Sequence, residues 1–371
     1  MIMKPMEARK LQPQMTNNIQ MLIGDVRETL KTVPDNSVNC CISSPPYYGL
    51  RSYVPDTAEY KCDEIGIEQS PEEFIENLVN VFREVRRVLT DDGVCFINIG
   101  DSYYNYRPGK GQALVQQGLD TELRGKPQEC ARRANRLDGL KEKDLIGIPW
   151  MLAFALRNDG WYLRQDIIWA KACSGVYSGG SVMPESTKDR FCRSHEYIFM
   201  LTKSSKYFFN IDAVSEKVEA INRIYSNNNM ENRKGKGDEQ FAINGKSQDA
   251  WYAKARERIA AGEELKRNRR SVWTVQIRPS KVSHYATYPS ELVEPCILAG
   301  CPENGVVLDP FGGTGTTAVT ATILGRNAIH CDLDPRTAEY IAARKIEIIK
   351  QRNSDGETIS NGKIIKTRKL F

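Results

Sequence analysis

The sequence lacks any long apolar run. Nowhere do roughly 18 or more apolar residues follow one another, whereas a helix needs about 20 to cross a bilayer. Residues 1–20 are also too polar for a secretory signal peptide. We therefore expect a cytoplasmic protein with no membrane partner.

Cysteine pairs at the spacing of metal ligands are missing as well, although the chain contains ten cysteines. None of them shows the spacing of a zinc site. Several fall in stretches that predict buried strands, where cysteine acts as a small hydrophobic residue: Cys40, Cys41, Cys95 and Cys331. We expect no metal site.

Most of the chain has no excess charge of either sign. The net charge is +5 over 371 residues, yet residues 223–281 hold 14 Lys and Arg against 7 Asp and Glu, a local net charge of +7. Such a stretch is either a solvated loop or a surface that contacts phosphates. The chain is long enough to bury one large α/β core with an insertion or small second domain.

A turn with two consecutive prolines follows an apolar stretch near the N-terminus. Residues 38–42 predict a buried strand, and Ser44-Pro45-Pro46-Tyr47 follows without a polar spacer. The prolines remove two backbone donors and fix two φ angles, so nearby carbonyls stay available as acceptors. Together with a hydroxyl and two aromatic rings, this turn suits a flipped nucleobase. The simpler interpretation is a strand-ending turn with Tyr47 packed on the core.

A glycine-rich turn lies far down the chain, in the sequence VVLDPFGGTGTT of residues 306–317. The pattern predicts a buried strand over 306–309, a turn through the glycines and a helix over 316–324. A second strand over 327–331 delivers Asp332, at a position where an acidic side chain typically holds ribose hydroxyls. The glycine spacing of dehydrogenases and the lysine of a phosphate loop are both absent.

Together the two motifs resemble the S-adenosylmethionine-dependent DNA amino-methyltransferases, which methylate exocyclic nitrogens of cytosine or adenine. The proline turn precedes the glycine turn, an order that resembles the beta group of that family. The resemblance implies an α/β fold with a doubly wound, mostly parallel seven-stranded sheet, the Rossmann-like class I methyltransferase fold, and an inserted target-recognition region. It also implies S-adenosylmethionine as cofactor and double-stranded DNA as partner, in a prokaryotic cell or a phage-infected host.

The resemblance further implies roles for individual residues. The residues implied in catalysis are Ser44, Pro45, Pro46 and Tyr47. The residues implied in cofactor binding are Asp25, Asp309, Phe311, Gly312, Gly313, Thr314, Gly315, Thr316 and Asp332. Asp25 also suits the N-cap of the helix that follows it. DNA binding is expected at Arg51 and at the basic cluster Arg267, Arg269 and Arg270.

Composition and the resemblance divide the chain into five parts. Residues 1–18 are expected to be a loose tail and 351–371 a basic tail. The catalytic half of the methyltransferase domain spans 19–202, the target-recognition region 203–272 and the cofactor-binding half 273–350. Within the first half, 107–144 has no aromatic residue and predicts a mobile loop, which either closes over DNA or is simply disordered.

The target base is expected to be cytosine, methylated at N4. In the resembled family a serine before Pro-Pro usually accompanies cytosine N4, whereas an aspartate accompanies adenine N6, which stays the alternative here. Two acceptors, the Ser44 hydroxyl and the Pro45 carbonyl, would hold the amino hydrogens. The resemblance places the enzyme in restriction-modification systems, with a cognate restriction endonuclease as a possible partner and either a monomer or a homodimer as its state.

Other classes of protein are less well supported. A cytosine C5 methyltransferase needs a Pro-Cys nucleophile, and Pro295-Cys296 exists, but it falls in a predicted helix before the glycine turn. A DNA-binding protein without activity would not need both motifs intact. An RNA or protein amide methyltransferase usually carries Asn before Pro-Pro, whereas this chain has Ser44.

Overall fold

The computed structural model describes residues 14–16, 18–49, 52–54, 58–104, 113–115, 127–129, 137, 139–174, 178–180, 182, 185, 187–218, 253–278, 287–360 and 362–366. The chain divides into two compact units, one made of residues 211–270 and the other of the chain on either side of it. Arg51 and most of the stretch 107–144 lie outside the described residues.

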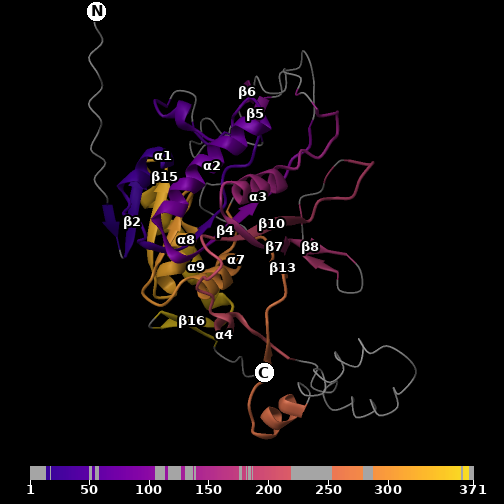
Figure 1. Ribbon diagram of the computed structural model, residues 1–371, viewed down its shortest axis with the longest axis vertical. Helices are drawn as coiled ribbons and strands as arrows, with labels where there is room; N and C mark the ends of the chain where they lie inside the picture. Colours follow the sequence, from indigo (N-terminus) through magenta and orange to yellow (C-terminus); the bar gives the residue numbers. More distant parts are fainter. Residues whose placement is uncertain are drawn as a thin grey trace, which may run out of the picture. The chain divides into compact units, whose positions relative to one another are not determined.

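The larger unit contains a nine-stranded sheet (Figure 1). Five of its strands are parallel neighbours, and β10 is antiparallel to both β4 and β7. The predicted α/β fold is confirmed, with β1 and β13 added at the edges of the seven expected strands. In spatial order the strands are β1 (Gln14–Thr16), β2 (Ile19–Ile23), β15 (Asn327–Asp332), β14 (Val306–Asp309), β3 (Val38–Ser43), β4 (Leu89–Ile99), β10 (His195–Thr202), β7 (Tyr162–Ala170) and β13 (Val272–Thr274).

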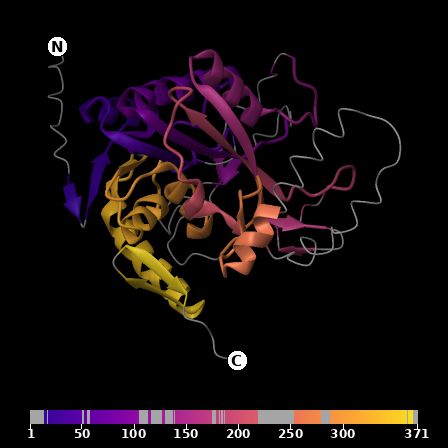
Figure 2. The same ribbon diagram turned by 60° about the horizontal axis from the view of Figure 1, so that its bottom comes forward.

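Helices cover both faces of this sheet (Figure 2). The first face carries helices of the N-terminal half: α1 (Val26–Thr29) with the 3-10 turn η1 (Leu30–Thr32), α2 (Pro71–Val88) and α3 (Ile148–Asn158). The second face carries α7 (Ser290–Gly300), α8 (Thr316–Ile323) and α9 (Thr337–Ser354). Ser70 caps the start of α2: its hydroxyl accepts the Glu73 N–H at 3.1 Å, and Pro71 takes the first helical position.

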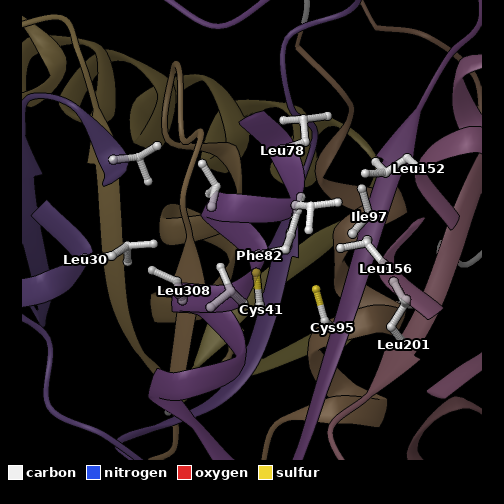
Figure 3. Close-up of a cluster of buried hydrophobic side chains, with 14 of the residues drawn as sticks. Leu30, Cys41, Leu78, Phe82, Cys95, Ile97, Leu152, Leu156, Leu201 and Leu308 are labelled. Carbon is white, nitrogen blue, oxygen red and sulfur yellow. The ribbon is translucent and has the colours of Figure 1, made fainter. Parts of the chain in front are cut away.

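Successive residues of the central strands point to opposite faces, so the sheet separates two hydrophobic cores. In β3, Cys41 packs in the core that contains Phe82 of α2, which Figure 3 shows. Its neighbours Cys40 and Ile42 pack in the other core, with Ile297 of α7. This alternation explains why the strand is apolar throughout: both of its faces are buried.

The strand order of the sheet reverses between β14 and β3, although these two strands run parallel to each other. From β14 the chain crosses through α8 to β15 on one side, whereas from β3 it crosses through α2 to β4 on the other. Ligands of doubly wound folds bind in the crevice that such a reversal opens at the carboxyl ends of the strands. The proline turn follows β3 and the glycine turn follows β14, so both motifs end at this crevice.

Shorter elements complete the described chain. Strands β5 (Ala113–Val115) and β6 (Pro127–Glu129) pair, as do β8 (Ala172–Cys173) and β9 (Gly179–Gly180). Residues 351–371, expected as a basic tail, instead contain the end of α9 and a hairpin of β16 (Glu357–Ser360) and β17 (Lys363–Lys366). Within the described ranges, no helix is both long and apolar enough to cross a membrane.

The smaller unit has its own short elements: α4 (Ile211–Val214), β11 (Glu216–Lys217), a helix at 253–260 and β12 (Lys266–Arg267). β11 and β12 pair in antiparallel fashion. Ala255 and Leu265 form a small buried cluster, against which Val218 and Ile259 pack.

Candidate active site

A cavity of about 700 Å³ lies at the carboxyl ends of β3 and β14. We call its two sides the proline half and the glycine half. All four residues of the proline turn line the cavity: Ser44, Pro45, Pro46 and Tyr47. So do most of the residues predicted to bind a cofactor: Asp25, Phe311, Gly312, Gly313, Thr314, Thr316 and Asp332. The structure therefore brings together two motifs that are far apart in the sequence.

Backbone geometry forms the glycine half. Gly313 and Gly315 have φ angles of 53° and 82°, in the left-handed region that glycine adopts without strain. Gly312 lies directly against β15, and a Cβ added there would fall 2.1 Å from ring atoms of His330. Its N–H donates to the Cys331 carbonyl at 2.9 Å. The turn is thus held on β15 at a distance that only glycine permits.

Asp332 lies at the end of β15 and faces the cavity. Its carboxylate accepts N–H bonds from Gly313 at 2.7 Å and from Asp334 at 2.8 Å. Burial raises the pKa of Asp332 to about 7, although these two donors oppose the shift. Asp25 caps α1 by accepting the Arg27 N–H at 2.9 Å, and it lines the same cavity. Two carboxyl groups thus offer acceptors in this half.

Asp309 does not line the cavity, but its hydrogen bonds connect the strand before the proline turn with the helix after the glycine turn. It is buried, and its oxygens accept hydrogen bonds from Ser43 at 2.7 Å, Thr317 at 2.7 Å and Tyr288 at 3.0 Å. Burial raises the pKa of Asp309, and the hydrogen bonds oppose that shift. Because Ser43 directly precedes Ser44, this carboxyl group sets the spacing between the proline turn and the glycine turn. Gly315, also expected to contact a cofactor, likewise does not line the cavity.

The proline turn is held by close packing. The Gly49 N–H donates to the Gly66 carbonyl at 3.0 Å, and a Cβ on Gly66 would lie 3.0 Å from Cβ of Pro46. The Tyr47 ring lies on Gly100, where an added Cβ would be 2.7 Å from the ring. The turn and the ring are therefore fixed against the ends of β3 and β4.

The proline half contains charged residues that the sequence reasoning missed. The Tyr47 hydroxyl donates to a Glu196 carboxylate oxygen at 2.6 Å, and Glu196 forms an ion pair with Lys171. The Asn98 side chain donates to the same carboxylate at 3.3 Å. Lys171 also lies over the Trp169 ring, 4.6 Å from its centre. All of these residues line the cavity. No local pattern of the sequence marks Glu196 or Lys171, because the pairing of β10 with β7 brings them together.

The predicted DNA-binding residues are not among those that line the cavity. Arg267, Arg269 and Arg270 are exposed and belong to the smaller unit. Arg267 and Arg270 form ion pairs with Glu216 at 3.4 and 3.2 Å. Arg51 is outside the described residues. Among the residues that the structure places, no cluster of His, Cys, Asp or Glu could hold a metal ion.

Comparisons with a family model and with individual proteins both point to DNA methylases. A protein-family model described as DNA methylase, of the N6/N4 type, matches residues 38–344. The type II methyltransferase M.Cfr9I of Citrobacter freundii is 38% identical over 340 residues, which cover 91% of each chain. The type II methyltransferase M.SmaI of Serratia marcescens is 35% identical over 333 residues, covering 90% of this chain and 91% of the relative.

A solved structure supports the fold. The structure of the PvuII DNA methyltransferase, described as cytosine-N4-specific, matches with a TM-score of 0.53. The match covers 93% of this chain and 96% of that chain at 16% sequence identity. At this level of identity the likeness concerns the fold alone.

Proposed function

The chain belongs to the N6/N4 family of DNA methylases, and we propose that it transfers a methyl group from S-adenosylmethionine to the exocyclic N4 of a cytosine flipped out of duplex DNA. The observation that carries this proposal is the shared cavity of the two turns. The Ser43 hydroxyl and the Asp309 carboxylate, 2.7 Å apart, tie the turns together at neighbouring strands. A methyl donor in one half and a base in the other would therefore meet.

The glycine half suits a nucleoside carrying an amino-acid chain. Asp332 and Asp25 offer oxygens to hydroxyl groups, and backbone amides at the start of α8 are available to a carboxylate. The rings of Phe311, Tyr60 and Tyr340 also line the cavity and offer apolar surface to adenine. When bound, S-adenosylmethionine supplies an electrophilic methyl group on its sulfonium.

The proline half would prepare the amine. The nitrogen lone pair of an exocyclic amine is delocalised into the base ring, which makes it a weak nucleophile. If the Ser44 hydroxyl and the Pro45 carbonyl accept its two hydrogens, the nitrogen can become pyramidal and turn its lone pair toward the glycine half. The Tyr47 ring, fixed on Gly100, is positioned to stack on the base. Orientation is then the main source of rate enhancement.

Cytosine N4 is proposed because Ser44 occupies the position where adenine-N6 enzymes of the family usually carry an aspartate. Adenine N6 is the alternative base. We further propose that the enzyme methylates a specific duplex site, with the exposed Arg267, Arg269 and Arg270 contacting phosphates. As in other type II systems, a restriction endonuclease of the same specificity would be its functional partner.

The deciding experiment combines mass analysis with two variants. The purified protein is incubated with S-adenosylmethionine and duplex DNA, and the nucleosides are analysed for N4-methylcytosine and N6-methyladenine. RNA and protein are offered in parallel. We expect N4-methylcytosine in DNA alone; N6-methyladenine would change the base, and methylated RNA or protein would change the substrate class.

Ser44→Ala and Tyr47→Ala should each reduce methylation by about 100-fold because they misplace the amine. Both should retain binding of S-adenosylmethionine, measured by calorimetry. Ser37→Ala is the matched control, since its hydroxyl donates to the nearby Pro34 carbonyl at 2.6 Å and Ser37 does not line the cavity. Unchanged turnover in both variants would refute the assignment of the proline turn.

A further inference from the structure

One large apolar side chain is almost fully exposed to water. Phe191 is 98% exposed, whereas the next most exposed large apolar side chain among the described residues, Val272, is 60% exposed. Single apolar side chains that are partly exposed are ordinary on protein surfaces. A phenylalanine that buries almost none of its ring is different, because it adds nothing to the core. Its position therefore asks for a role in binding.

The topology of the sheet places Phe191 near the cavity. The segment that carries it leads directly into β10, which is antiparallel to β4, with Tyr197 opposite Ile99. β10 therefore begins at the carboxyl end of β4, the edge of the sheet where the cavity lies. Arg193, two residues after Phe191, lines the cavity, and so does Glu185. Phe191 thus lies at the rim of the cavity.

Contacts on both sides of Phe191 hold the backbone that carries the ring. Arg190 forms an ion pair with Glu185 at 2.5 Å, and its guanidinium lies over the Tyr103 ring, 3.8 Å from the ring centre. The same guanidinium donates to the Phe191 carbonyl at 3.2 Å. On the other side, the Arg193 N–H donates to the Glu185 carboxylate at 3.2 Å. Because the segment is held before any partner arrives, binding through the ring costs less ordering entropy.

The charge around the ring fits a nucleic acid as its partner. Residues 187–193 carry three positive charges and one negative charge, and Lys188 is exposed. Phosphates attract such a segment, and an aromatic ring can stack on bases. Extruding a base from a duplex breaks its stacking and leaves a gap in the helix. Proteins that deform DNA often insert an apolar side chain such as phenylalanine between bases.

We propose that Phe191 is a wedge, which enters the duplex at the rim of the cavity and takes the stacking position of the target base while that base occupies the proline half. The inference rests on the proposed function, because only an enzyme that extrudes a base needs such a wedge. The contacts of Arg190 and Arg193 with Glu185 hold the wedge in place. Phe191 touches neither the methyl donor nor the amine, so it is a positioning residue.

Phe191→Ala tests the wedge on two duplexes that carry the site found by sequencing methylated DNA. The target base is paired in one duplex, and in the other an abasic position lies opposite it, so that extrusion costs less. Single-turnover methyl transfer and the Kd of each DNA are measured. On the paired duplex we expect the ratio of rate to Kd to fall by about 10- to 100-fold, as for the loss of one aromatic stack. On the abasic duplex the loss should be about threefold or less.

Two further variants separate stacking from other effects. Phe191→Trp keeps a flat ring and should stay within about threefold of wild type on the paired duplex. Phe209→Ala is the matched control, because Phe209 is also exposed but lies toward the other edge of the sheet. There the Phe208 N–H donates to the Asp92 carbonyl at 2.9 Å, near the start of β4. Since Phe191 buries almost none of its ring, Phe191→Ala should unfold at the same urea concentration as the wild type.

Equal losses on the two duplexes would overturn the inference, because a contact with the outside of the DNA does not depend on base pairing. A Phe191→Ala ratio within about twofold of wild type on the paired duplex would also overturn it. So would a change of oligomeric state in sedimentation velocity, which would assign the ring to a protein interface. If the wild-type protein methylates no DNA, the proposed function fails instead, so the two failures are distinguishable.

Discussion

The two halves of the cavity are built in different ways. The core of the glycine half is one continuous segment, β14 through β15, and its shape depends on backbone atoms that approach each other closely at Gly312. The proline half depends on side chains from four separate places, because Tyr47, Asn98 and Lys171 all meet at the Glu196 carboxylate. At Gly312 the first half leaves no room for a Cβ, whereas the second half depends on the identity of each polar group.

This difference separates binding from chemistry. Changes in the glycine half should act on the affinity for S-adenosylmethionine and on stability, because they move the backbone. Changes in the proline half should act on the rate of methyl transfer while the fold and the cofactor affinity persist. The following variants test that division.

Gly312→Ala should have the largest effect. The added methyl group would lie 2.1 Å from the His330 ring. This ring is buried and hydrogen-bonded to the Thr337 hydroxyl at 2.7 Å, so it has little room to move. We expect a loss of about 1 to 3 kcal/mol in the free energy of unfolding and of most cofactor binding. Urea unfolding and calorimetry measure both. Gly179→Ala is the control, since a Cβ there meets nothing within 4 Å. Normal cofactor affinity in Gly312→Ala would show that the turn is not rigid.

Asp332→Asn should have an intermediate effect that depends on pH. Burial raises the pKa of Asp332 to about 7 from 3.8, so the folded protein holds an extra proton between these values. Stability from this group is therefore present at low pH and is lost as pH rises toward 7. The asparagine variant lacks this slope, so the difference in unfolding free energy between the two proteins should change between pH 5 and about 7 and then level off.

Urea unfolding without cofactor at several pH values measures that difference. Asp35→Asn removes an exposed carboxylate outside the cavity and is the control for affinity, since it should bind S-adenosylmethionine as the wild type does. The Asp332 variant should also bind S-adenosylmethionine at least about tenfold more weakly, since a hydrogen bond to a charged group contributes about 1.5 to 3 kcal/mol. An unchanged pH slope in the Asp332 variant would contradict the raised pKa.

Cys296→Ser should have the smallest effect, because this residue belongs to neither half. It lies buried in α7, where its thiol donates to the Leu292 carbonyl at 3.6 Å, a bond that a serine hydroxyl can also make. Methyl transfer should stay within about twofold of wild type, with a stability change of about 1 kcal/mol. A folded but inactive variant would point to a cysteine nucleophile and to cytosine C5 chemistry.

The same difference explains what could be predicted from the sequence. β3 and β14 were predictable because each is an apolar run that stops at a proline or glycine turn, a purely local pattern. Glu196 and Lys171 carry no local pattern, since only the antiparallel pairing of β10 with β7 brings them together. The hairpin of β16 and β17 did have a local signal, the dipeptide Asn361-Gly362 between two four-residue strands, which is typical of a tight turn.

The hydrogen bond between Ser43 and Asp309 also has a consequence for biosynthesis. It connects residues 266 positions apart, so the two turns can meet only after the glycine turn has left the ribosome. Contacts of such long range form late, because closing a large loop costs entropy before it yields any interaction. A nascent N-terminal fragment that already contains Ser44 thus has no partner strand to complete the site, and the cavity can form only once β14 is available.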